Sequence, residues 1–329
     1  MLHIDYHMIV ENAKKIKSKC GVPLCAVVKS DAYGHGSVRT VSVLDGIVDS
    51  FAVGTVEEAT KITEYTKSEI AVLLPSYKTD ELCFASSHNL VLTICNDESL
   101  LAAIECRLPL KCQIKVDSGM SRLGFHQEEL VKVCQAIKSS SALCPVGTFS
   151  HLWGERKTDV LRQVEYFKKC AEYCNASFGK RMTNHIANTN AAINIPQSRL
   201  DAVRIGLGLY GYGNSDLNVA KTVTANVIAV RHVKRGDVLG YGGKNRATKN
   251  GYVAVVDYGY SNGFIRTLIG SNVLVGGHRG RVAAVCMGMT LIETANYLPH
   301  VGEEAVLLGK QVNPSNFNTI VYELLCNLR

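Results

Sequence analysis

LCAVVKSDAYGHG, residues 24–36, is the stretch that decides how the rest of the chain is interpreted. Five apolar residues precede Lys29, and a polar turn with two glycines follows it. A short continuous apolar run is typical of a strand that is covered on both faces in a parallel sheet. A lysine at the end of such a strand usually lays its stem on apolar surface and extends its ammonium into water. A chemical function for Lys29 therefore depends on what the rest of the chain places beside it.

Seven further apolar runs follow the first one, at residues 51–56, 70–74, 90–95, 112–116, 145–150, 183–187 and 203–211. Segments with a helical pattern lie between them, and several open with Asp, Thr or Gln and an early Glu, as in DESLLAAIE at 97–105. Strands that alternate with helices favour a parallel sheet. Eight such units predict an α/β fold, a (β/α)8 barrel of the TIM type.

Polar residues cluster where the predicted strands end. In a (β/α)8 barrel these ends and the loops after them carry the functional groups. A purely structural chain has no reason to gather so many polar groups at one rim. The residues in question are Lys29, Asn96, Lys115, Asp117, His151, Asn188 and Arg204.

The pattern changes after YGYGNSD at residues 210–216. β-branched runs separated by glycine turns follow, as in GYVAVVDYGY and SNVLVGG, and they predict an all-β domain. We therefore expect the barrel at residues 9–212 and the C-terminal β domain at 213–329. Residues 1–8 contain a short run, LHIDY, which we expect to be a strand that joins the C-terminal domain.

Composition excludes several classes of protein. The formal charge is +7, but the basic residues are dispersed along the chain, which argues against a nucleic-acid partner and favours a small anionic ligand. No apolar run is long enough to cross a membrane, and the N-terminus lacks the features of a signal peptide. The twelve cysteines show no metal-binding spacing, so we expect no metal site and reduced thiols in a cytoplasmic protein.

The stretch around Lys29 resembles a known family motif. AVVKSDAYGHG is similar to the lysine motif that binds pyridoxal 5′-phosphate in alanine racemases, which belong to fold type III. Further motifs of that family occur in the same order across nearly the whole chain. They are KVDSGMSRLG (115–124), FSHL (149–152), HIANTNAA (185–192), AVRIGLGLYG (202–211), GYSNGFIR (259–266), CMGMT (286–290) and YELLC (322–326).

The resemblance implies a two-base mechanism. Lys29 would hold the cofactor covalently and act as acid and base on one face of the substrate's α-carbon, while Tyr260 acts on the opposite face. Racemisation requires this arrangement because the proton must be able to return from the side opposite to the one that lost it. In the family the tyrosine comes from the second subunit, with the histidine that matches His151 nearby, so the resemblance also implies a homodimer with shared active sites.

Arg204 matches an arginine that faces the pyridine nitrogen of the cofactor in the family. A guanidinium hardly ever gives up its proton, so the ring nitrogen would stay unprotonated and the cofactor would be a weaker electron sink. Return of the proton to the α-carbon would then compete well against transamination. The alternative is a surface arginine in an ion pair.

The remaining family positions would bind the cofactor or the substrate. Arg122 would orient the phenolic oxygen of the cofactor and help hold the substrate carboxylate, with the backbone N–H of Met287 as a second donor. Lys115 matches a lysine that is often carbamylated, and a plain lysine paired with Asp117 is the alternative. The phosphate would be bound by Tyr33, Asn188, Thr189, Gly206, Leu207 and Tyr322.

Two positions depart from the family pattern and leave the substrate open. The family usually has Met-Asp where this chain has Met287-Gly288, and Ser where it has Thr189. Racemisation of L-alanine to D-alanine, a small amino acid, is the expected activity, with serine racemisation as the alternative. Some serine racemases are parts of longer membrane-anchored proteins. Under that alternative, this chain, which begins almost at its first strand, would be a portion of a longer protein.

Two less favoured alternatives come from other classes of protein. Fold-related amino-acid decarboxylases share the lysine motif but carry a Gly-Gly-Gly phosphate loop and a C-terminal Cys-Glu motif, neither of which occurs here. A non-catalytic pyridoxal-phosphate carrier would consist of a single barrel. The segment GYSNGFIR argues against that carrier.

Overall fold

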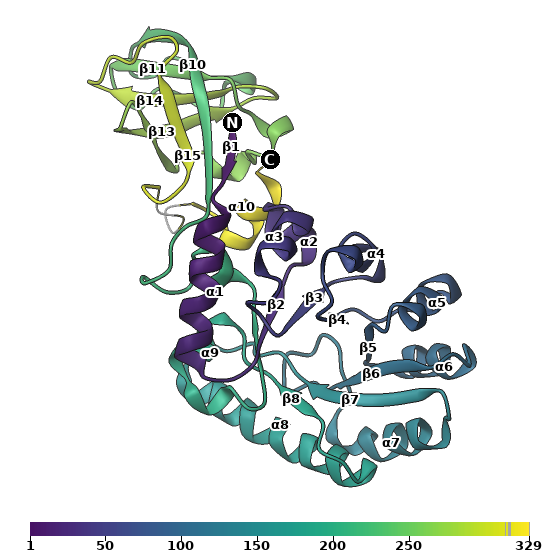
Figure 1. Cartoon of the computed structure of the whole chain (residues 1–329). Coiled ribbons are helices and arrows are strands. Elements are labelled where there is room, and N and C mark those ends of the chain that lie inside the picture. Colours follow the sequence, from purple (N-terminus) through teal and green to yellow (C-terminus); the bar gives the residue numbers. More distant parts are fainter. Residues whose placement is uncertain (313, 315–316, 329) are drawn as a thin grey trace. The chain divides into compact units, whose positions relative to one another are not determined.

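The structure is a computed structural model that describes residues 1–312, 314 and 317–328. Its contacts divide the chain into two compact units, which Figure 1 shows as ribbons. One unit comprises residues 6–32 and 36–218, and we call it the barrel unit. The other comprises residues 1–5, 33–35 and 219–329, and we call it the β unit.

Eight parallel strands form the centre of the barrel unit, in the order β8-β7-β6-β5-β4-β3-β2-β9. Two backbone hydrogen bonds, from Asp201 N to Asn184 O and from Arg204 N to Ala187 O, connect the two ends of this nearly closed sheet. The predicted (β/α)8 barrel is therefore confirmed. The strands are β2 (Leu24–Val27), β3 (Ser50–Val53), β4 (Glu69–Val72), β5 (Val91–Ile94), β6 (Leu110–Lys115), β7 (Leu143–Phe149), β8 (Thr183–His185) and β9 (Val203–Ile205).

The strand predicted at 203–211 is wrong beyond Ile205. A 3-10 helix, η4 (Leu207–Tyr210), takes up most of the rest of that run. Leu209 and Tyr210 are fully buried in this helix, which explains why the run stays apolar. Periodicity alone cannot separate a buried strand from a buried helical turn.

Helices lie outside the barrel strands, as Figure 1 shows for α4 to α8. α6 begins with a capping box in which Asn96 and Ser99 bond reciprocally to each other's backbone N–H. The helices of this unit that lie around the barrel are α1 (Tyr6–Cys20), α3 (Ser37–Leu44), α4 (Val56–Thr60), α5 (Thr79–Ser87), α6 (Asp97–Glu105), α7 (Leu130–Ser139), α8 (Lys157–Phe178) and α9 (Thr189–Asn194). Short 3-10 helices add η1 (Thr63–Tyr65), η2 (Gln127–Glu129) and η3 (Pro196–Ser198).

The β unit is built on an antiparallel sheet with the order β1-β10-β11-β14-β13-β12-β15, and a further pairing of β10 with β15 curls it back on itself. The predicted C-terminal all-β domain is confirmed, and β1 from the N-terminus pairs with β10. The strands are β1 (Leu2–Ile4), β10 (Lys221–Val233), β11 (Gly251–Val256), β12 (Asn272–Val275), β13 (His278–Val285), β14 (Thr290–Ala295) and β15 (Glu304–Leu308). The helices are η5 (Tyr241–Gly243), η6 (Tyr260–Asn262), η7 (Arg266–Leu268) and α10 (Val321–Asn327).

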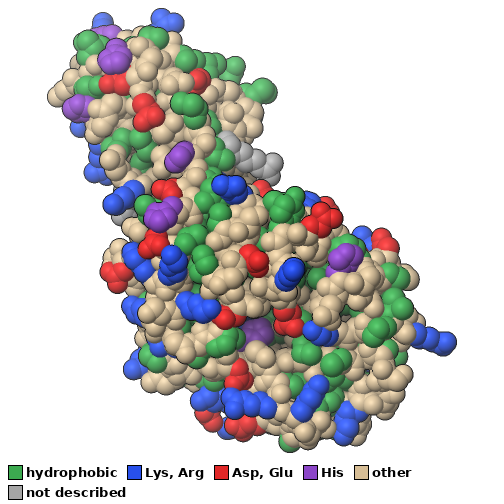
Figure 2. All heavy atoms as spheres, in the orientation of Figure 1, with side chains coloured by type: hydrophobic (Ala, Val, Ile, Leu, Met, Phe, Trp, Pro, Cys, Tyr) green, Lys and Arg blue, Asp and Glu red, His purple; other side chains and the backbone are tan. Residues whose placement is uncertain are grey.

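The surface shows no single block of charge on the face drawn in Figure 2, where basic and acidic side chains are interspersed. No helix in the described part of the chain is long and apolar enough to cross a membrane. All twelve cysteines are free thiols.

Candidate active site

Lys29 stands at the start of an unusual turn. β2 ends at Val27, and Lys29 begins α2 (Lys29–Gly34), in which residues 30–33 all have φ between +52° and +54°. None of these four residues is glycine, and a left-handed backbone costs an ordinary residue roughly 1–2 kcal/mol. Such strain persists only where the surroundings enforce it, and it gathers at functional sites.

The carboxylate of Glu58 enforces the beginning of this turn. Its Oε1 accepts a hydrogen bond from the backbone N–H of Ser30 at 2.8 Å, and its Oε2 accepts one from that of Gly54 at 2.7 Å. Gly54 lies so close to Lys29 that a β-carbon there would be 3.7 Å from the β-carbon of Lys29. Glu58 was not predicted as a site residue, because an acidic residue in the first turn of a helix is ordinarily explained by its favourable interaction with the helix dipole.

Arg204 is buried in β9, with 5% of its surface exposed. Its Nη1 donates to His185 Nδ1 at 2.6 Å, and its Nη2 donates to the carbonyl oxygen of Ser150 at 2.6 Å. No carboxylate in the described part of the chain forms an ion pair with it, so the surface ion pair considered above is wrong. Burial lowers the pKa of Arg204 to about 10, so the guanidinium keeps its charge at neutral pH.

Two histidines beside Arg204 are neutral. A guanidinium can only donate, so the Nδ1 of His185 must accept, and its proton therefore sits on Nε2. Burial, and then the charge of Arg204, holds the pKa of His185 well below its usual range. Burial is also the largest cause for His151, followed by the charges of Arg204 and Arg122, and together with nearby lysines they lower its pKa to about 3. His185 was missed as a site residue, although it begins the motif HIANTNAA.

Lys115, the last residue of β6, is a buried cation among cations. Burial lowers its pKa to about 8, with further contributions from the charges of Arg122, Arg204 and Lys29. Its Nζ lies 5.3 Å from the ring centroid of Phe149, over which Arg204 also lies at 5.2 Å. A cation over an aromatic face is stabilised by the negative charge of that face.

The alternative that pairs Lys115 with Asp117 finds no support. The Oδ1 of Asp117 accepts from the backbone N–H groups of Gly119 and Met120, both at 2.8 Å. Lys115 forms no ion pair with any carboxylate of residues 1–312, 314 or 317–328. Arg122 is exposed in the loop after β6, and its charge still acts on both Lys115 and His151.

These observations define a cationic cluster at the carboxyl ends of the barrel strands, made of Lys29, Lys115, Arg122, His151 and Arg204. Asn96, another of the polar residues predicted at this rim, caps α6. The cluster brings four basic side chains together around a neutral histidine. An anion entering it would relieve repulsion among them.

Two neighbouring loops bring the predicted phosphate ligands of the barrel unit together. The Oδ1 of Asn188 caps α9 by accepting from Ala191 N at 3.1 Å. Thr189 Oγ1 accepts from the backbone N–H of Gly208 at 3.1 Å, which ties the loop after β8 to the loop after β9. Gly206 and Leu207 lie in the second of these loops, directly after β9.

The other predicted residues belong to the β unit and form two groups there. Tyr260 begins η6 and donates its backbone N–H to Cys286 O at 3.0 Å, next to Met287, whose carbonyl accepts from Ser261 N at 2.9 Å. Tyr260 and Met287 are exposed, and a β-carbon at Gly288 would meet nothing within 4 Å. The rings of Tyr33 and Tyr322 lie 5.8 Å apart between centroids.

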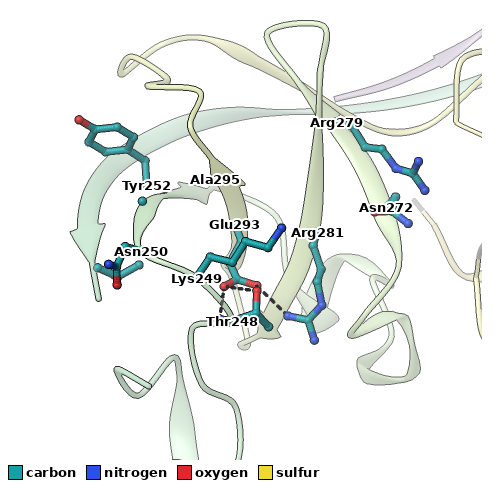
Figure 3. A pocket seen from close by; sticks show the side chains of 11 residues that line it. Thr248, Lys249, Asn250, Tyr252, Asn272, Arg279, Arg281, Glu293 and Ala295 are labelled. Carbon is teal, nitrogen blue, oxygen red and sulfur yellow. Dashed lines mark hydrogen bonds and ion pairs between the residues drawn. The ribbon is translucent and has the colours of Figure 1, made fainter. Parts of the chain in front are cut away.

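A separate cavity of about 270 Å³ lies in the β unit, where Figure 3 shows Glu293 bonded to Arg281 and Thr248. The ion pair of Glu293 with Arg281 measures 2.8 Å. None of the predicted site residues lines this cavity. The chemistry described above therefore lies elsewhere.

The donor set fits pyridoxal phosphate. The cofactor needs an amine for its aldehyde and donors for its phosphate, and it is anionic overall. Lys29 is an amine in an electropositive cluster with Lys115, Arg122 and Arg204, while the loops at 188–189 and 206–207 supply amide, hydroxyl and backbone N–H groups.

Comparison with known proteins gives one consistent result. Residues 4–214 match the family model described as alanine racemase, N-terminal domain, and residues 220–329 match alanine racemase, C-terminal domain. A protein of Neisseria meningitidis serogroup A named alanine racemase is 32% identical over 97% of this chain and 94% of its own length. A catabolic alanine racemase of Pseudomonas putida is 31% identical over 99% of this chain and 96% of its own. The crystal structure of biosynthetic alanine racemase from Pseudomonas aeruginosa has a TM-score of 0.90 and 28% identity, covering 100% of this chain and 96% of that one.

Proposed function

The chain belongs to the alanine racemase family, and on that premise we propose that it is a pyridoxal-phosphate-dependent enzyme that interconverts L-alanine and D-alanine. The observation that carries the proposal is the cationic cluster around Lys29, in which Lys115 and Arg204 are buried and form no ion pair with a carboxylate of the described residues. A cluster of this kind suits an anionic cofactor and a substrate with a carboxylate group.

When bound, pyridoxal phosphate supplies an aldehyde that links to an amine and a ring that withdraws electrons from the α-carbon. Lys29 holds it and moves a proton at the α-carbon on one face. Arg204, protonated at neutral pH, holds the ring nitrogen without giving it a proton. Arg122 and the backbone N–H of Met287 hold the substrate carboxylate.

The phosphate is held by neutral donors. These are the side chains and backbone groups of Tyr33, Asn188, Thr189, Gly206, Leu207 and Tyr322. A carbamate on Lys115 would turn a repelling cation into an anion that fixes Arg122.

Tyr260 of the partner subunit moves the proton on the opposite face of the α-carbon, so the working unit is a homodimer. The exposed position of Tyr260 in its own chain supports this, since 44% of its surface is open to a partner. His151 has a pKa of about 3 and is therefore a neutral imidazole that can hydrogen-bond the phenol without adding charge.

The other expected activities receive no support from the relatives reported above, all of which bear the name alanine racemase. This holds for serine racemisation, for the fold-related decarboxylases and for the non-catalytic carrier. The match to the C-terminal domain model weighs further against a carrier of a single barrel.

The test combines spectroscopy with a chiral assay. The purified protein is given pyridoxal phosphate, its visible absorbance is recorded, and the enantiomers formed from L-alanine and L-serine are measured. We expect Lys29→Ala to lose the absorbance of the bound cofactor and nearly all activity, and the exposed-lysine control Lys138→Ala to keep both. Unchanged absorbance in Lys29→Ala would exclude Lys29 as the anchor, and a clear preference for serine would overturn the proposed substrate.

A further inference from the structure

Lys221 is a lysine without a solvent-exposed surface. It is the first residue of β10, and 0% of its surface is accessible. Burying an ammonium is costly unless hydrogen bonds replace the lost water. Its Nζ donates to three carbonyl oxygens, those of Gly34 at 3.0 Å, Leu325 at 2.7 Å and Leu328 at 2.6 Å.

Two of these acceptors belong to the C-terminal end of α10. The last carbonyls of a helix have no partner within the helix, and the macrodipole makes that end partially negative. The ammonium of Lys221 therefore satisfies these carbonyls and matches their charge. α10 has only seven residues, and helices this short depend on such tertiary contacts.

The third acceptor belongs to the segment that follows Lys29 in the sequence. Gly34 has φ +71°, and a β-carbon there would lie 2.4 Å from Leu325 O and 3.0 Å from Lys221 Nζ. Only glycine permits this approach. Lys221 thus joins two backbones, the segment at 33–35 and the end of α10.

Each of these backbones carries one tyrosine. Tyr33 directly precedes Gly34, and Tyr322 lies in the first turn of α10. Their rings are 5.8 Å apart, and Tyr33 is buried while Tyr322 is exposed. A fixed link between the two backbones therefore fixes the spacing of the two phenols.

We propose that Lys221 is a positioning residue that holds Tyr33 and Tyr322 in one arrangement for an anionic phosphate group. The inference rests on the proposed function, in which both phenols bind the phosphate of the cofactor. Lys221 itself does not touch the cofactor in this proposal. It acts by holding the two backbones together, so its loss weakens recognition of the phosphate and leaves recognition of the ring intact.

The test compares two ligands that differ only in the phosphate. Dissociation constants for pyridoxal phosphate and for pyridoxal are measured by absorbance titration in the wild type and in Lys221→Met, which keeps the length of the side chain and lacks its donors. We expect the affinity for pyridoxal phosphate to fall about tenfold, as for the loss of one charge-assisted hydrogen bond between a tyrosine hydroxyl and the phosphate. The affinity for pyridoxal should change little. Lys234→Met, at an exposed lysine just after β10, should change neither.

Two further variants guard against a general loss of folding. Gly34→Ala disturbs the same junction at the segment 33–35 and should give the same selective loss of affinity for pyridoxal phosphate. If Lys221 acts through Tyr322, the losses in Lys221→Met and Tyr322→Phe should not add in the double variant. Equal weakening of both ligands, or additive losses, would overturn the proposal.

Amide hydrogen exchange of the cofactor-free protein tests the structural link apart from the function. We expect faster exchange in α10 in Lys221→Met and no change in Lys234→Met. A wild type that binds no pyridoxal phosphate would refute the proposed function. A wild type that binds it, with unchanged phosphate selectivity in Lys221→Met, would refute the inference alone.

Discussion

The surroundings of Lys115 change the reactivity of its amine. Only a neutral amine combines with carbon dioxide to form a carbamate and release a proton, and the pKa of Lys115 is lowered to about 8. We therefore expect Lys115 to take up label from ¹³C-bicarbonate increasingly as pH rises through 8 at constant dissolved carbon dioxide. Mass spectrometry and carbon NMR would locate the label.

Lys132 is the matched control for this labelling. It is exposed, and its hydrogen bond and ion pair with Asp97 raise its pKa. It should therefore stay unlabelled under the same conditions. Equal labelling of both lysines, or none at Lys115 above pH 8, would contradict the prediction.

The same shift makes stability depend on pH. Between pH 8 and 10.5 the unfolded chain keeps a proton on Lys115 that the folded chain has lost, so the free energy of unfolding should rise with pH in this window. A shift of this size corresponds to roughly 3 kcal/mol. Denaturant unfolding across the window should show a rise that Lys115→Met lacks and that Lys138→Met, at an exposed lysine, retains.

The left-handed turn after Lys29 is held by hydrogen bonds to the carboxylate of Glu58. Glu58→Ala removes the acceptor of two backbone N–H groups, at Ser30 and Gly54. We expect the free energy of unfolding to fall by about 2 kcal/mol, as for hydrogen bonds to a charged group, and amide exchange at both positions to accelerate. Glu57→Ala is the matched control, since the exposed carboxylate of Glu57 forms an ion pair with Lys61 at 3.7 Å. Unchanged exchange in Glu58→Ala would show that something else holds the turn.

The end of α10 makes a second tight junction, with the turn after Tyr260. Gly263 has φ +90°, and a β-carbon there would lie 1.8 Å from Asn327 O. Gly270 has a similar φ of +95° with nothing within 4 Å, so Gly270→Ala isolates the cost of the backbone angle, roughly 1–2 kcal/mol. Gly263→Ala should lower the free energy of unfolding by clearly more than that in denaturant titrations. Equal decreases in the free energy of unfolding in the two variants would mean that the junction accommodates the added β-carbon without a further energetic penalty.

Helices and strands could be predicted where burial produces a recognisable pattern of apolar residues in the sequence. The eight barrel strands were found because most of their residues are buried, and the helix at 97–105 was found from its opening Asp and Glu and its pattern. The left-handed turn was not found, since Ser, Asp, Ala and Tyr do not announce positive φ as glycine does. Lys221 was not found either, because lysine is almost never fully buried unless its partners, distant in sequence, are already in place.

At the scale of the whole molecule, shared sites make a prediction about mixed dimers. If Tyr260 serves the partner's site, a dimer of one Lys29→Ala chain and one Tyr260→Phe chain has one complete site and one doubly defective site. Random mixing makes half of the dimers mixed, so activity should recover to about one quarter of the wild type. A chiral assay after unfolding and refolding the mixture would measure it. Mixtures no more active than the separate variants would indicate that each chain completes its own site.

The lysine motif is divided between the two units, and this limits where the chain can be truncated or recombined. Residues 33–35 follow Lys29 closely in sequence, yet by their contacts they belong with residues 219–329. A truncation after residue 218 would keep Lys29 and remove the neighbours of Tyr33 and Gly34. If the C-terminal half were exchanged with that of a relative, residues 33–35 should therefore be exchanged with it to keep these contacts matched.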